Sequence, residues 1–407
     1  MYQIREERTN KKTKAYTLLI PAMLDAHFPL LKYAFYSKKY HPVVLETEEG
    51  ITNLGLKYVH NDLCYPGILI VGQIIKTLQS GIYDVNRTVV LEPQAGDACR
   101  GSNYIPMIRK ALDDAGFPMV PVISLNVTGL EKKNHLPITT DLLFRAVAAA
   151  YYGDLLMILK NQISPYECNI GQTEEIYQKW LNVLSKDMCT GKGLNFKNMK
   201  INFNRIVKDF AEIPRKQMNL MKIGVVGELY IKYCHIGNWN LESFLKQQNC
   251  EYYINGITWY ALYYVDTHLL TEGGKEKTGV SVKGYQMVFD YFLKLQRNMV
   301  EAIRNAGFYV MDAYDIFKKK AEGYVTYQCA IGDGWLIGAE FANHALNGYN
   351  RIICGQPFGC LPSHVCGRGL YPAIRRKLPD TQYISVDYDS SGTDTLLKSR
   401  IKMLLSF

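Results

Sequence analysis

The chain has 407 residues, of which 48% are apolar, 21% charged and 12% aromatic, and its formal net charge is +9. A chain of this length and composition can bury a substantial core in two or three lobes, which excludes an intrinsically disordered protein. The basic residues are scattered, as at 318–320 and 375–377, and form no dense stripe with interleaved aromatic side chains, so nucleic acid is not an expected partner.

Strands and helices alternate through the first third of the chain. Short β-rich runs predict strands at 16–21, 42–46, 88–92 and 119–125. Helical patterns lie between them at 26–40, 68–79 and 104–115. This alternation indicates βαβ units and therefore a parallel sheet.

The middle of the chain, 137–220, has no β-rich run and shows a helical periodicity, for example at 140–160 and 174–186. Alternation resumes afterwards, with strands expected at 222–228, 351–354 and 383–386, and helices at 284–306, 364–376 and 393–405. We therefore predict an α/β protein with two Rossmann-like parallel-sheet blocks and a helical insert between them. The expected boundaries are an N-terminal α/β domain at 1–136, a helical lobe at 137–220 and a C-terminal α/β domain at 221–407.

No segment predicts export or a membrane span. The first 14 residues contain no apolar stretch of the kind found in a secretory signal. The apolar stretch 147–160 is interrupted by Gly153 and Asp154 and is shorter than the roughly 20 residues that cross a bilayer. We expect a cytoplasmic protein without membrane contact, in which ten cysteines indicate metal binding or reactive thiols and not disulfides.

Several common catalytic and binding motifs are missing. The chain has no G-x-x-x-x-G-K-[ST] loop and no G-x-G-x-x-G fingerprint between a strand and a helix, so we expect no ATP binding. It also has no H-E-x-x-H and no G-x-S-x-G motif. Paired C-x-x-C knuckles and ferredoxin-type cysteine spacing are absent as well, which argues against a zinc ribbon and a ferredoxin.

Three cysteines, Cys64, Cys99 and Cys360, lie in turns with Gly or Pro within two residues. A thiolate in such a turn meets backbone N–H donors, which suits a metal ligand or a nucleophile better than a core thiol. Cys99 and Cys360 each follow a predicted strand, and open α/β sheets bind ligands beyond the carboxyl ends of their strands. Three thiolates can hold three irons of a cubane and leave the fourth iron open, so we predict cluster binding by these three residues.

Other residues are weaker candidates. Cys354 is expected to be buried at a strand end, and Cys366 to begin a helix. His364 and Asn103 are candidate catalytic residues, the first as a proton donor and the second, with Arg100, as a group that positions a substrate or tunes the cluster. Each can equally be an ordinary polar residue of a turn or a helix start. Glu92 and Gln94 precede Cys99 and are candidates to support its loop; the remaining cysteines are expected to be structural: Cys168, Cys189, Cys234, Cys250 and Cys329.

The strings around these cysteines resemble one protein family. They are Leu-Ile-Pro-Ala-Met near the start, Asn-Asp-Leu-Cys-Tyr-Pro-Gly around Cys64, Gly-Asp-Ala-Cys-Arg-Gly-Ser-Asn-Tyr around Cys99, Val-Pro-Val-Ile-Ser-Leu-Asn ending at 126 and Gln-Pro-Phe-Gly-Cys-Leu-Pro-Ser-His around Cys360. The chain is similar, from about residue 15 onward, to the acyl-CoA dehydratase activase-related proteins. These are relatives of the iron–sulfur subunits of 2-hydroxyacyl-CoA dehydratases and benzoyl-CoA reductases.

The resemblance implies an oxygen-sensitive 4Fe–4S or double-cubane cluster, an anaerobic organism and a separate ATP-hydrolysing activase of actin-like fold. The expected function is that of an iron–sulfur component that accepts an electron from the activase and passes it to a small molecule or an acyl-CoA thioester, as a lyase or oxidoreductase, within a homo- or heterodimer. Two alternatives stay open. One is a non-catalytic electron-transfer or scaffold subunit, and the other is a zinc or thiol enzyme that uses Cys360 and His364.

Overall fold

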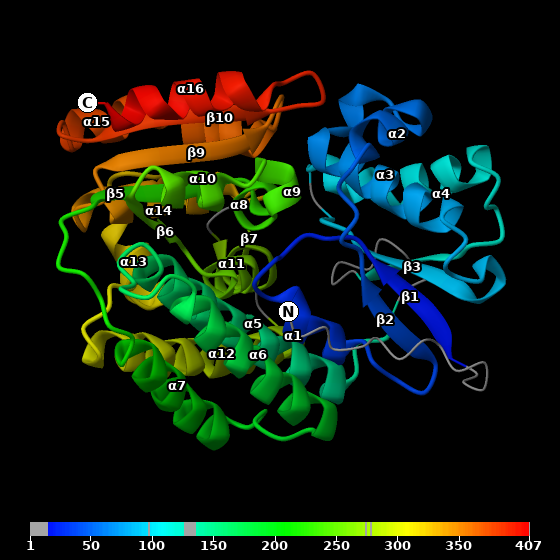
Figure 1. Ribbon diagram of the computed structural model, residues 1–407, viewed down its shortest axis with the longest axis horizontal. Helices are drawn as coiled ribbons and strands as arrows, with labels where there is room; N and C mark the ends of the chain where they lie inside the picture. The colour runs from blue at the N-terminus through cyan, green and yellow to red at the C-terminus, as the bar shows by residue number, and fades with distance from the viewer. Residues whose placement is uncertain (1–14, 97, 126–135, 273–274, 277–278, 407) are drawn as a thin grey trace.

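The computed structural model describes residues 15–96, 98–125, 136–272, 275–276 and 279–406. The start of the chain, for which the sequence predicts no secretory signal, and Asn126 lie outside these ranges. Figure 1 shows one α/β block at the right, a second at the upper left and a helical lobe beneath the second. The prediction of an α/β fold with two parallel sheets is confirmed.

The first block is a four-stranded parallel sheet in the order β2-β1-β3-β4. Its strands are β1 (Tyr16–Ile20), β2 (Tyr40–Val44), β3 (Thr88–Pro93) and β4 (Val122–Leu125). Its longer helices are α2 (Ile51–Tyr58), α3 (Tyr65–Gln79) and α4 (Tyr104–Asp114). Most residues of α3 are apolar and nearly all are buried, so the helix packs in the interior of the block.

The second block is a four-stranded parallel sheet in the order β10-β9-β5-β6. Its strands are β5 (Met221–Gly227), β6 (Cys250–Ile254), β9 (Arg351–Pro357) and β10 (Gln382–Tyr388). Its helices are α8 (Leu229–Tyr233), α9 (His235–Asn238), α10 (Leu241–Gln247), α14 (Gly334–Leu346), α15 (Tyr371–Lys377) and α16 (Asp394–Leu405). β5 and β9 approach so closely at their ends that a Cβ on Gly227 would lie 1.9 Å from the carbonyl oxygen of Gly355.

The strand order reverses at one place in each sheet. In the first sheet β2 lies on one side of β1 and β3 on the other, and in the second sheet β6 and β9 flank β5 in the same way. The connections therefore leave in opposite directions between β1 and β3 and between β5 and β9. Such switch points open a crevice at the carboxyl ends of the strands, where open α/β sheets bind ligands.

The helical lobe has its own hydrophobic core. Its helices are α5 (Thr140–Ile163), α6 (Gln172–Thr190), α7 (Phe196–Ala211), α11 (Ile257–Tyr264), α12 (Val280–Asn305) and α13 (Tyr314–Lys320). Residues from both sides of 220 share this core, so α11 to α13 complete the lobe predicted at 137–220. The short pair β7 (Thr271–Glu272) and β8 (Lys275–Glu276) is antiparallel.

By length and composition, α5 is the one helix of the described residues that could cross a membrane. Within its most apolar window, 67% of the residues are buried inside the fold. The core helix of a soluble protein has the same properties, so this finding is weak evidence for a membrane span.

Two predicted helices differ from the observed structure. Only α1 (Phe28–Leu31) and a 3₁₀ turn (Lys32–Ala34) form within 26–40, because the Ser37 hydroxyl accepts the amides of Lys39 and Tyr40 and turns the chain into β2. The stretch 364–376 is divided into a π-helical turn, η6 (Ser363–Arg368), and α15. Cys366 therefore lies inside a π-helical turn and does not begin a helix.

Candidate functional site

Cys64 has an unusual backbone conformation at the start of α3. Its φ of 89° and ψ of 157° lie in a region that is populated almost only by glycine. The half-buried thiol lies 2.8 Å from the Tyr104 hydroxyl and forms a hydrogen bond with it. Burial raises the pKa of the Cys64 thiol, and the hydrogen bond from Tyr104 opposes this rise only in part. Strain of this kind costs about 1–3 kcal/mol and is concentrated at functional sites.

Cys99 lies in the loop that follows β3, immediately before the 3₁₀ turn η4 (Arg100–Asn103) and α4. Its sulfur accepts a long hydrogen bond, 3.4 Å, from the amide of Gly101 and so caps the turn. Gln94 supports the same loop, because its amide donates to the carbonyl of Ser102 at 2.8 Å. The predicted supporting role of Gln94 thus corresponds to an observed contact.

Cys360 lies in the loop that follows β9. Gly359 has a φ of 72°, which allows the sharp turn at the end of the strand. The Ser363 hydroxyl donates to the Cys360 sulfur at 3.3 Å. Burial is the main cause that raises the pKa of the Cys360 thiol to about 12, and the carboxylate of Glu228 adds to it.

The loops of Cys99 and Cys360 meet although 260 residues lie between them. A Cβ on Gly359 would lie 3.8 Å from a guanidinium nitrogen of Arg100, so the side chain of the residue after Cys99 reaches the neighbourhood of the residue before Cys360. The segment around Cys64 also reaches the second block. The Ser390 hydroxyl donates to Asn61 at 2.8 Å, and the Trp239 indole donates to the Tyr65 hydroxyl at 2.8 Å.

Glu228 and Tyr104 each interact electrostatically with two of the three cysteines, Glu228 with Cys64 and Cys360, and Tyr104 with Cys64 and Cys99. Glu228 follows β5, and its carboxylate caps α8 by accepting the amide of Ile231 at 3.0 Å. The Glu228 charge contributes to the raised pKa of both Cys64 and Cys360, after burial in each case. Burial and, to a lesser degree, the charges of Cys64 and Cys99 raise the pKa of Tyr104. The three thiols are therefore near enough to one junction between the blocks to share electrostatic neighbours.

The other predicted polar residues, Asn103, His364 and Glu92, differ in how far they are buried. Asn103 is exposed and precedes α4 without a side-chain capping hydrogen bond. His364 is partly buried in η6, and its amide donates to the carbonyl of Cys360. Glu92 is 1% exposed at the end of β3, and neither of its carboxyl oxygens has a hydrogen-bond partner among the described residues. Burial alone raises the pKa of Glu92 well above its usual value.

Cys354 and Cys366 do not join the junction thiols. Cys354 is buried within β9, as expected, with its sulfur beside Gly367. The Cys366 and Cys329 sulfurs lie 3.0 Å apart, a pairing that sequence spacing did not indicate. All ten cysteines are free in this structure. Within the described ranges, no three Cys, His, Asp or Glu side chains are grouped closely enough to hold a metal ion as they stand.

Comparison of the chain with protein-family models gives no match. Comparison with curated protein sequences gives none either. The family resemblance of the cysteine strings therefore stays a prediction, and the geometry of the junction bears on function through the positions of its side chains alone.

Proposed function

We propose that this chain is the iron–sulfur component of an ATP-dependent, low-potential reductase or dehydratase system of the type that its cysteine strings resemble. In this proposal Cys64, Cys99 and Cys360 bind a 4Fe–4S cluster. The observation that carries it is the proximity of the Cys99 loop to the Cys360 loop, each of which follows the carboxyl end of a strand in its own parallel sheet. That is where an open α/β sheet accommodates a ligand.

The state of the thiols favours a metal centre over a thiol nucleophile. The raised pKa values of Cys64 and Cys360 keep both thiols protonated at neutral pH, and a protonated thiol is a poor nucleophile. A bound metal displaces the thiol proton, so burial opposes a metal-bound thiolate less than it opposes a free thiolate. In the described residues, the hydroxyl on the Cys360 sulfur comes from Ser363, and no hydrogen bond joins this sulfur to His364. A zinc or thiol enzyme built on Cys360 and His364 is therefore the less supported alternative.

The residues around the thiols have defined tasks in this proposal. A bound cluster supplies one-electron transfer at low potential, and an iron without a thiolate ligand can accept an oxygen atom of a substrate. The hydroxyls of Tyr104 and Ser363 donate to two of the cysteine sulfurs, which orients these ligands and raises the reduction potential. Arg100 provides a cation at the junction for an anionic substrate such as an acyl-CoA thioester. Asn103 and His364 are the candidates to position that substrate or move a proton.

ATP hydrolysis is assigned to a separate partner, an activase of actin-like fold, because the sequence lacks a loop that cradles a triphosphate. We also propose that the protein acts in the cytoplasm of an anaerobic organism. This is consistent with its ten free cysteines. The second candidate function, a non-catalytic electron-transfer subunit, uses the same cluster and differs only in where the substrate binds.

Anaerobic purification with iron and sulfide analysis tests the proposal. We expect a brown protein with about four irons and four sulfides per chain, or about twice that number for a double cubane. A colourless protein that binds one zinc ion per chain, and takes up no iron on anaerobic reconstitution, would overturn the iron–sulfur function. Substrate reduction that needs only this chain, the activase, ATP and a one-electron reductant for the activase would identify the chain as the catalytic component. Micromolar binding of ATP to the isolated chain would contradict the division of labour between the two proteins.

A further inference from the structure

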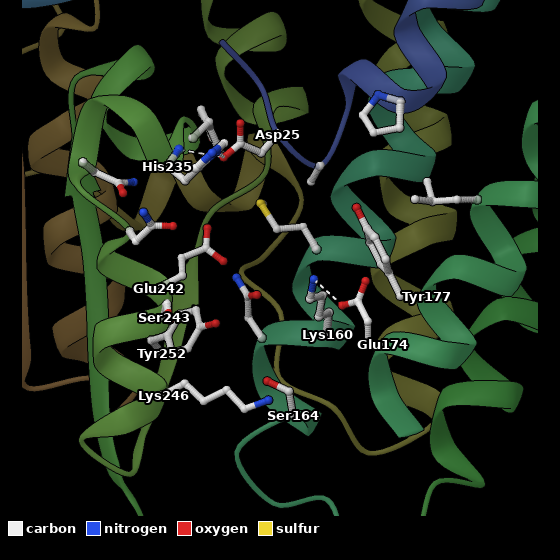
Figure 2. A pocket seen from close by; sticks show the side chains of 18 of the residues that line it. Asp25, Lys160, Ser164, Glu174, Tyr177, His235, Glu242, Ser243, Lys246 and Tyr252 are labelled. Atoms are coloured by element: carbon white, nitrogen blue, oxygen red, sulfur yellow. Dashed lines mark hydrogen bonds and ion pairs between the residues drawn. The ribbon is translucent and has the colours of Figure 1, made fainter. Parts of the chain in front are cut away.

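A second site lies where all three parts of the molecule meet, away from the cysteine strings. A cavity of about 520 Å³ is bordered by the loop after β1, by α5 and α6 of the helical lobe and by α8 to α10 of the second block. Figure 2 shows the side chains of Glu242 and Lys246 reaching into it from one side and those of Lys160 and Tyr177 from the other. Cavities at such meeting points are the usual places for small-molecule sites.

Most charges in this cavity are already paired within the protein. His235 binds Asp25 at 2.7 Å through Nδ1 and Glu48 at 2.8 Å through Nε2. The hydrogen bond to Asp25 is the main cause that raises the pKa of His235 to about 9, so the imidazolium balances one of the two negative charges of Asp25 and Glu48. On the opposite wall Lys160 binds Glu174 at 2.7 Å. These pairs lie in the walls of the cavity. The lining groups that have no partner are the ones that a ligand could bind.

One unpaired group is the amide of Asn161. This α5 residue lines the cavity and is 2% exposed, and its Nδ2 has no hydrogen-bond partner within the described part of the chain. A buried donor without a partner costs about 1–3 kcal/mol, so such a group calls for an acceptor that the protein itself does not provide. A ligand with an oxygen acceptor, such as a carboxylate, satisfies it. Lys246 pairs with Glu167 at 3.4 Å, and its side chain, which is 45% exposed, also lines the cavity and adds positive charge there.

The second unpaired group is the carboxyl of Glu242, which forms no hydrogen bond or ion pair within the described ranges. Burial, followed by the nearby Asp25 carboxylate, raises the pKa of Glu242 to about 7. A cationic group in the cavity would relieve both causes by pairing with the ionised carboxylate. The tyrosines of the lining, Tyr177 and Tyr252 among them, offer apolar and aromatic surface to the carbon skeleton between the two charged ends of a ligand.

We propose that this cavity binds a small zwitterion of the amino-acid class, with its ammonium on Glu242 and its carboxylate on Asn161 Nδ2 and Lys246. A bare metal ion would leave the Asn161 donor without an acceptor, and a simple carboxylic acid would leave Glu242 without a cation. The zwitterion satisfies both. This inference goes beyond the proposed function and does not depend on a cluster at the cysteines.

Isothermal titration calorimetry of the full chain with each of the twenty free amino acids tests the proposal. We expect saturable binding of at least one of them. Its N-acetyl derivative, which lacks the ammonium, and its amide, which lacks the carboxylate, are matched probes, and each should bind at least about tenfold more weakly. The proposal fails if none of the twenty binds below about 10 mM, or if the acetylated probe binds as well as the free amino acid.

Variants assign the binding to this cavity. Glu242→Gln and Asn161→Leu should each weaken binding at least about tenfold. Lys179→Ala is the matched control, because Lys179 lies on α6 next to the cavity residue Gln178 but pairs with Asp209 outside the cavity. Thermal unfolding of each variant checks that it is folded. Unchanged binding in a folded Glu242→Gln protein would overturn the assignment, whereas the iron content of the same preparations tests the cysteine site separately.

Discussion

The two α/β blocks have similar residues at the ends of their strands, but these residues have different hydrogen-bond partners. Each has a cysteine-bearing loop after a strand and a glutamate at a strand end. In the first block Glu92 is buried with neither oxygen paired, whereas in the second block Glu228 caps α8 and its charge reaches two of the thiols. Each block also directs a hydroxyl at a cysteine sulfur, Tyr104 in the first and Ser363 in the second. The comparison teaches that the junction is assembled from both halves, and that, among the described residues, only the acid of the second block is hydrogen-bonded to backbone amides.

The largest expected effect concerns the cysteines themselves. Cys64→Ala and Cys99→Ala in the first block and Cys360→Ala in the second should each abolish the cluster or severely deplete it, because a cubane needs ligands from both sides. Cys189→Ala and Cys250→Ala should leave iron content and the EPR signal intact, since the first is exposed and the second lies within β6. Full iron in any of the first three variants would refute the ligand assignment.

Cys329 and Cys366 form a second thiol site, and a variant of this pair tests whether the cluster lies there or at the junction. Cys366→Ala should cost about 1–2 kcal/mol of unfolding free energy, because it deletes a buried sulfur, and should keep the iron content of the wild type. Chemical denaturation and iron analysis of the same preparation measure both effects. Loss of iron in this variant would move the cluster away from the junction of the blocks.

Removing the two carboxyl groups should change stability in opposite directions, because Glu228 accepts a backbone hydrogen bond and Glu92 accepts none within the described residues. The raised pKa of Glu92 means that the folded protein holds its proton more tightly than the unfolded chain. The contribution of Glu92 to the free energy of unfolding therefore falls as the pH rises from about 4.3, the pKa of a glutamate in the unfolded chain, toward the higher pKa of Glu92 in the folded protein. Glu92→Gln should be more stable than the wild type at pH 7 by more than about 1 kcal/mol, and the difference should shrink toward pH 4.

Glu228→Ala is the counterpart in the second block. Burial raises the pKa of Glu228 too, but the amides of Ile231 and Tyr230 oppose this rise. The variant removes the oxygen that caps α8 and should lose about 1 kcal/mol of unfolding free energy at neutral pH. Urea denaturation of both variants between pH 4 and pH 8 provides the comparison. If Glu92→Gln is the less stable of the two at pH 7, the difference between the blocks described above is wrong.

The smallest expected effects are those of the two hydroxyls. Tyr104→Phe and Ser363→Ala each remove one hydrogen bond to a cysteine sulfur, worth about 1 kcal/mol, which corresponds to about 40 mV for one electron. Both should keep the iron and lower the reduction potential, with the larger change in Tyr104→Phe because its contact is shorter, 2.8 against 3.3 Å. An EPR-monitored redox titration measures the potentials. Equal potentials in both variants and the wild type would show that these hydroxyls do not contact the cluster ligands.

The sequence by itself determined the elements whose signals are local. Alternation of apolar strands with amphipathic helices predicted both parallel sheets, and the Gly and Pro residues around the cysteines predicted that Cys64, Cys99 and Cys360 lie in turns. It missed β6, a five-residue buried strand whose apolar run resembles any other buried segment. It also missed the local interruption at 35–39, where a single serine side chain overrides an amphipathic pattern.

Tertiary structure alone decided which of these turns meet. The proximity of Arg100 to Gly359 and the pairing of Cys366 with Cys329 join segments that are far apart in sequence, so no spacing could reveal them. The same holds for the cavity, because Asn161 and Glu242 look like ordinary polar helix residues until packing buries the Asn161 amide without a partner and places Glu242 at the same cavity. Local conformation depends on neighbouring residues, whereas burial and proximity depend on how the strand order brings distant loops to one edge.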